Sequence, residues 1–121
     1  MSNNVLIIGR DSEHLDAVLG IFADHFPNTN IVRCGSIGDG IIEMKKYYFG
    51  LLVIDLSMDL TVERLGGIPT PPAIAILKDN IVTEIYTHLT KNDILDIVAF
   101  VVLPIENDFI PLLKSALINY N

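Results

Sequence analysis

The chain has 121 residues, half of them hydrophobic, and 8 Lys and Arg against 15 Asp and Glu give it a formal charge of −7. This length suits one domain, which we place at residues 1–121. So few cations exclude direct binding to nucleic acid and disfavour an anionic membrane surface. No apolar run approaches the roughly 18 residues of a membrane helix. Residues 1–4 lack the basic start of a signal peptide, so we expect a cytoplasmic protein.

The chain has few side chains for metal binding or covalent chemistry. Its single cysteine, Cys34, cannot form an internal disulfide, and with His14, His25 and His88 it makes a poor zinc set. We expect Cys34 to be a small buried residue and the histidines to have helical surface or edge roles rather than metal-binding or pH-sensing ones. No cofactor, metal or catalytic residue is predicted.

Five short apolar runs are the strongest pattern along the chain. They cover residues 5–8, 30–34, 51–54, 73–77 and 99–103. Apart from residues 30–34, which include Asn30 and Arg33, these runs have no internal polar breaks and fit strands that are buried on both faces, as in a parallel sheet.

Apolar residues at helical spacing follow three of these runs. The three stripes are Leu15, Val18, Leu19, Phe22 and Phe26, then Ile37, Ile41, Met44 and Tyr48, and finally Phe109, Leu113, Ala116 and Tyr120. Ser12 and Ser36 are predicted to cap the first two helices, which end at Pro27 and Gly50. The tyrosines in and around the helical stretches are interpreted as packing residues: Tyr47, Tyr48 and Tyr86.

Two stretches are less regular. A short helix is predicted around residues 60–65, ahead of a proline-rich loop into the fourth strand. Residues 78–98 favour one or two helical pieces. A hairpin is the alternative, because residues 81–83 and 85–87 are rich in strand formers.

Alternating strands and helices predict a flavodoxin-like α/β fold. We expect a three-layer sandwich, with helices on both faces of a five-stranded parallel sheet of order 2-1-3-4-5. Ligands of such folds bind at the carboxyl ends of the strands. The glycines of residues 35–40 lack the spacing of a dinucleotide fingerprint and predict a turn.

The third run closes on Asp55, a buried strand followed directly by an acid. Together with Pro72 before the fourth strand, Phe100 in the fifth and Pro104 after it, this resembles the receiver domain of two-component response regulators. The resemblance runs from residue 5 to about residue 117. It implies a role in signal transduction, with Asp55 at the phosphoacceptor position.

The chain departs from the receiver pattern around that aspartate. The family's first strand ends in two adjacent acids that hold magnesium, and these positions carry Gly9 and Arg10, with Asp11 one place further on. The hydroxyl residue that ends the fourth strand is replaced by Leu77. The lysine that ends the fifth strand, just before the proline, is replaced by Leu103.

Asp55 therefore keeps its position without the groups that support phosphorylation. Phosphoryl transfer depends on stabilising the charge of the phosphoryl oxygens, and magnesium needs several oxygen ligands. Weak magnesium binding at Asp55 is not expected. Three roles stay open for Asp55: capping its loop through backbone amides, pairing with Arg10 as a fixed mimic of an active state, or residual phosphate acceptance. Arg10 could equally be a surface charge.

The predicted function is that of a pseudo-receiver, a non-enzymatic regulatory domain that acts through protein contact or dimerisation without phosphorylation. The resemblance implies a contact face built from the fourth helix, fifth strand and fifth helix, within residues 81–89, 100–104 and 109–120. Phe100 is at the switching-aromatic position, with a core role as the alternative. A working receiver phosphorylated on Asp55 by a histidine kinase is one alternative function. The other is a flavodoxin-like domain that binds a small anion at residues 9–12.

Overall fold

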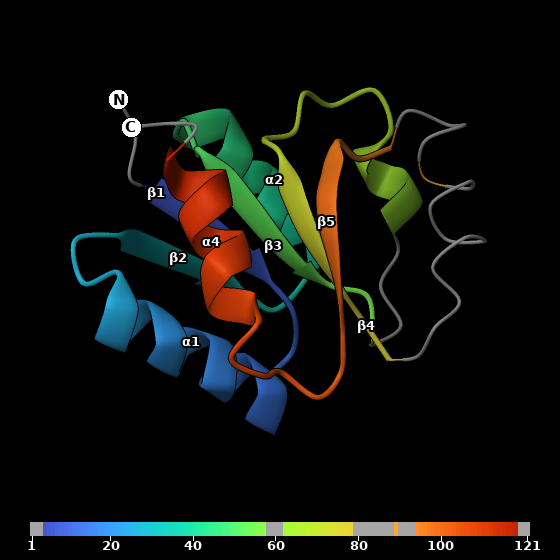
Figure 1. Ribbon diagram of the computed structural model, residues 1–121. Coiled ribbons are helices and arrows are strands. Elements are labelled where there is room, and N and C mark those ends of the chain that lie inside the picture. The colour runs from blue at the N-terminus through green and yellow to red at the C-terminus, as the bar shows by residue number, and fades with distance from the viewer. Residues whose placement is uncertain (1–3, 58–61, 79–88, 90–93, 119–121) are drawn as a thin grey trace.

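The computed structural model describes residues 4–57, 62–78, 89 and 94–118 (Figure 1). The elements of this part are β1 (Asn4–Ile8), α1 (Glu13–His25), β2 (Asn30–Cys34), α2 (Ile37–Lys46), β3 (Leu51–Asp55), the 3-10 helix η1 (Val62–Leu65), β4 (Ala73–Leu77), β5 (Ile97–Val102) and α4 (Phe109–Ile118). None of the helices in these ranges has the length and apolar character to cross a membrane.

The five strands form one parallel sheet in the order β2-β1-β3-β4-β5, which confirms the predicted α/β fold. The two strands β3 and β4 are buried at every position, as strands with covered faces must be. Because the strands are parallel, their carboxyl ends meet at one edge of the sheet. Asp55 and Leu77 end β3 and β4 at this edge.

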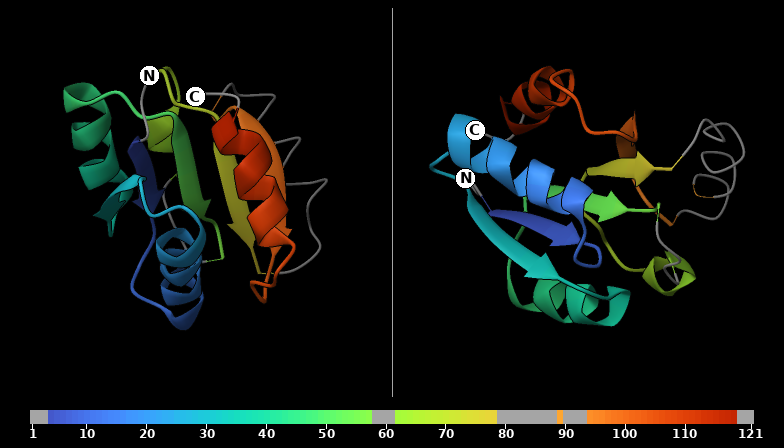
Figure 2. Two further views of the ribbon diagram at one scale, coloured as in Figure 1. Left: turned by 60° about the vertical axis from the view of Figure 1, so that its left-hand side comes forward. Right: turned by 90° about the horizontal axis from the view of Figure 1, so that it is seen from below.

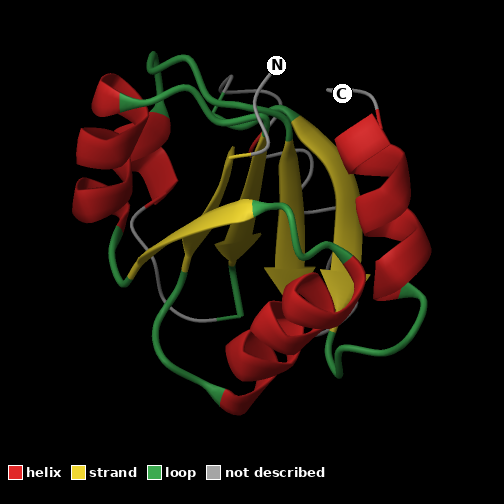
Figure 3. Cartoon of the chain, turned by 90° about the vertical axis from the view of Figure 1, so that its left-hand side faces the viewer, coloured by secondary structure: helices red, strands yellow, loops and turns green. Residues whose placement is uncertain are grey.

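Helices cover both faces of the sheet and make three layers (Figures 2 and 3). Leu15, Phe22 and Phe109 from α1 and α4 pack with one set of strand side chains. Ile37 from α2 and Leu65 from η1 pack with the other set. Successive residues of β1 and β3 point to opposite faces, so each strand contributes to both cores.

The predicted helix caps are confirmed. The Ser12 hydroxyl accepts a hydrogen bond from the Leu15 amide at 3.2 Å, and the Ser36 hydroxyl accepts one from the Asp39 amide at 3.2 Å. Each bond satisfies an amide that has no partner within its helix. Both helices therefore begin one residue after a serine that the sequence marks.

The helix α2 ends at Lys46, two residues before the predicted stripe ends at Tyr48. Tyr47 is extended, and the residues Tyr47 and Tyr48 are 57% and 69% exposed. The prediction that both tyrosines pack was therefore wrong. The chain leaves the helix at Tyr47, and Phe49 takes the buried place at 4% exposure.

Other boundaries also differ from prediction. The helix predicted around residues 60–65 is the 3-10 helix η1, and β5 begins at Ile97 rather than at residue 99. Residues 79–88 and 90–93, which hold most of the predicted helical pieces with Tyr86 and His88, lie outside the described residues. Leu89 between them is buried.

Candidate functional site

Asp55 is the charged residue buried in the described core, with no exposed surface. It ends β3, in the middle of the sheet, where its backbone is in register with Ile76 of β4. The apolar sequence of residues 51–54 places β3 deep between the layers, and the carboxylate is carried to the sheet edge at full burial. A buried carboxylate is costly unless its oxygens are hydrogen-bonded.

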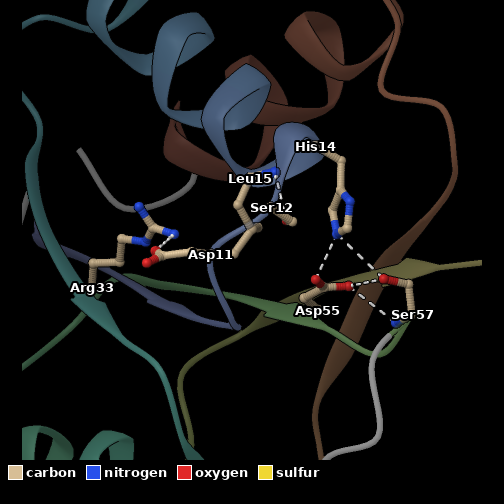
Figure 4. A network of polar contacts seen from close by, with 7 residues as sticks. All are labelled: Asp11, Ser12, His14, Leu15, Arg33, Asp55 and Ser57. Atoms are coloured by element: carbon tan, nitrogen blue, oxygen red, sulfur yellow. Dashed lines mark hydrogen bonds and ion pairs between the residues drawn. The ribbon is translucent and has the colours of Figure 1, made fainter.

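Both carboxylate oxygens have partners (Figure 4). The Ser57 amide donates to Oδ1 at 3.0 Å, and the Ser57 hydroxyl makes a short bond to the same oxygen. On the other side, His14 Nε2 lies 2.6 Å from Oδ2. The Ser57 amide bond matches the prediction that Asp55 caps its own loop.

His14 reaches Asp55 because of where α1 begins. Ser12 caps α1, so His14 falls in its first turn, directly above the end of β3 (Figure 4). The histidine side chain is 19% exposed. His14 lies on a helix as predicted, but the predicted surface or edge role did not include its contact with Asp55. Since β1 pairs with β3, the segment after β1 must pass beside Asp55, and that adjacency was available from the predicted strand order.

Ser57 was not singled out from the sequence. An aspartate followed two residues later by a serine is typical of a turn in which the carboxylate accepts backbone and hydroxyl hydrogen bonds. The contact of Ser57 Oγ with His14 Nε2, 3.3 Å away, joins the three residues into one network. We call His14, Asp55 and Ser57 the Asp55 network.

Gly9 packs directly against this network. A side chain at position 9 would place its Cβ 2.7 Å from Leu15 Cδ1 and 2.8 Å from Asp55 Cβ. Such distances require both Leu15 and Asp55 of β3 to move. An acidic residue at position 9, as a receiver-type magnesium site has, therefore does not fit the present backbone spacing.

Neither Arg10 nor Asp11 pairs with Asp55. Arg10 is exposed, and Asp11 pairs with Arg33 of β2 at 2.6 Å, on the side away from His14 (Figure 4). Between residues of the described ranges, Asp11 forms an ion pair with Arg33, and the Asp55 carboxylate contacts the His14 ring. The alternative in which Arg10 pairs with Asp55 is therefore wrong, and His14 holds that position.

The remaining predicted positions lie at the end of β4, within β5 and directly after it, and all are apolar. Leu77 is 1% exposed, and its carbonyl accepts a hydrogen bond from the Leu103 amide at 2.8 Å. Leu103 is half-buried against the core beneath α1 and α4, and the peptide bond to the exposed Pro104 is cis. Phe100 is partly buried and packs on the core beneath α2. None of these side chains offers a charged or hydroxyl group to a phosphoryl group.

The Asp55 network does not have the geometry of a hydrolytic triad. In such a triad the acid and the nucleophile contact different ring nitrogens, so that the histidine can pass a proton. Here Asp55 and Ser57 both face His14 Nε2, and the Ser57 hydroxyl also bonds to the carboxylate. In the described ranges no three His, Cys, Asp or Glu residues gather where they could hold a metal ion.

The strand order, the parallel pairing and the two helical layers define a flavodoxin-like α/β domain. A similar solved structure is the N-terminal domain of a response regulator/sensory box/GGDEF 3-domain protein from Carboxydothermus hydrogenoformans. It matches with a TM-score of 0.70 and 15% identity, over 97% of this chain and 95% of that one. At this identity the match establishes the fold. No protein-family model and no curated protein sequence matches the chain.

Proposed function

We propose that this chain is a signalling domain of the receiver type whose regulatory contacts do not depend on phosphorylation. The fold match to the N-terminal domain of a response regulator protein supports the signalling class. The Asp55 network supports independence from phosphate, because it engages both oxygens of the carboxylate that would accept the phosphoryl group. The proposal rests on the observation that His14 and Ser57 together engage both oxygens of the Asp55 carboxylate.

The side chains at the carboxyl edge of the sheet also support independence from phosphorylation. Formation of an acyl phosphate needs a cation and hydrogen-bond donors around the incoming phosphoryl oxygens. Gly9, Leu77 and Leu103 stand where a receiver has an acid, a hydroxyl and a lysine. Attack by Asp55 would also require an oxygen to leave His14 or Ser57.

Phosphorylation can be tested with acetyl phosphate and magnesium, followed by intact-mass measurement. We expect no phosphoryl increment under conditions that label a receiver with a complete acid pair. Beryllofluoride with magnesium should likewise leave the amide spectrum unchanged. A magnesium-dependent increment that Asp55→Asn removes would contradict the proposal and favour a working receiver.

A protein-contact role needs a surface, and the β5–α4 face is the candidate. Val98 on β5 is 53% exposed, and a hollow of about 200 Å³ beside it is lined by Ala99, Leu112 and Ala116 among others. The strand β5 is entirely apolar in sequence, yet Val101 is its only buried residue, at 6% exposure. An apolar strand at the edge of a sheet is a common contact surface.

Dimerisation through this face can be tested by light scattering over a range of concentrations. We expect a concentration-dependent dimer that Val98→Lys weakens. Ile42→Lys is the matched control, since Ile42 is 52% exposed on α2, on the opposite side of the sheet. A monomeric mass at every concentration, or equal effects of both substitutions, would remove the dimer from the proposal.

A further inference from the structure

We draw no further inference here: the strongest candidate, the largely apolar hollow between the end of α2 and the loop before β4, is lined by Met44, Tyr47, Tyr48, Phe49 and residues 69–72, and nothing in the structure shows what covers it.

Discussion

Asp55 places a carboxylate where no water reaches it, and its hydrogen bonds to His14 and Ser57 offset the cost of burial. Replacing His14 by Ala removes the partner of Oδ2 and leaves that oxygen buried. We expect the free energy of unfolding to fall by about 2 kcal/mol, less than for a fully buried pair because His14 is partly exposed. Urea unfolding followed by circular dichroism measures the change.

Repeating the His14→Ala change in an Asp55→Asn background separates the loss of the contact with Asp55 from the loss of His14 packing. In an Asp55→Asn background the His14→Ala change should cost less than about 1 kcal/mol, because the buried charge is absent. His25 lies at the exposed end of the same helix, and His25→Ala should change the free energy of unfolding by less than about 0.5 kcal/mol. Equal costs of His14→Ala in both backgrounds would show that the pair does not couple.

Cys34 gives a residue-scale prediction of pH dependence. Burial raises the pKa of the Cys34 thiol, and the nearby charges of Glu43 and Asp39 raise it further. The folded state therefore holds the thiol proton more tightly than the unfolded chain. The protonated Cys34 thiol therefore contributes to the free energy of unfolding at pH values below the thiol pKa of the unfolded chain. This contribution is lost as the pH rises through the thiol pKa of the folded state.

The reactivity of Cys34 should follow from its raised pKa and burial. At pH 8 a disulfide reagent should label the native chain at least about tenfold more slowly than the chain unfolded in urea. The native rate should climb as the pH is raised above 9. Equal native and unfolded rates at pH 8 would contradict the burial of this thiol.

At the residue scale the sequence located Asp55 but not its partners. A buried run that ends in an acid is visible in the letters 51–55, whereas the approach of His14 depends on the helix cap at Ser12 and on which strand lies beside β3. His14 is 41 positions away from Asp55 in the chain. The local periodicity assigns His14 to a helix but does not indicate which side chain His14 contacts.

Two helical glycines show how an element's packing decides the effect of one methyl group. Gly20 is exposed on α1, and an added Cβ would meet nothing within 4 Å. Gly20→Ala should therefore stabilise the protein by about 0.5–1 kcal/mol, through better helix propensity and a less flexible unfolded chain. Thermal unfolding measures the gain.

Gly40→Ala is the matched change in α2 and should have the opposite sign. A Cβ at position 40 would overlap Ile8 Cδ1 and lie 3.0 Å from Ile8 Cγ1, and Ile8 is completely buried in β1. The expected net loss is about 1–2 kcal/mol, since overpacking exceeds the gain in helix propensity. Stabilisation by both substitutions would mean that α2 does not contact β1 as closely as described.

The elements were predictable to the extent that their ends carry local markers. The strands β2 and β4 and the starts of α1 and α2 match the predicted bounds, because prolines, glycines and capping serines bracket them. The end of α2 was missed. Tyr48 continues the helical spacing, but the chain must turn towards β3 at Tyr47, and that requirement comes from the sheet.

At the scale of the molecule, the two cores lie on opposite faces of the same strands. Leu65 belongs to one core and Leu113 to the other, and both are completely buried. Because β1, β3 and β4 contribute to both, we expect loss of either core to unfold the whole sheet. Leu65→Ala and Leu113→Ala should each lower the free energy of unfolding by about 3 kcal/mol.

The cooperativity of unfolding tests whether the two cores unfold together. Urea transitions followed by far-ultraviolet circular dichroism and by tyrosine fluorescence should coincide for the parent and for both variants. A variant in which the two probes separate would show that one helical layer unfolds on its own. Residues 1–121 would then not behave as a single cooperative unit.

The close contact at Gly9 also sets an order in which the sequence can change over evolution. An acid at position 9 would overlap both Leu15 and Asp55, so it is tolerated only after Leu15 becomes smaller and β3 shifts as well. A lineage starting from this chain would thus need linked changes at position 15 and around β3 before it could build a cation-binding sheet edge. Among diverging relatives, an acid at position 9 should therefore occur together with a smaller residue at position 15.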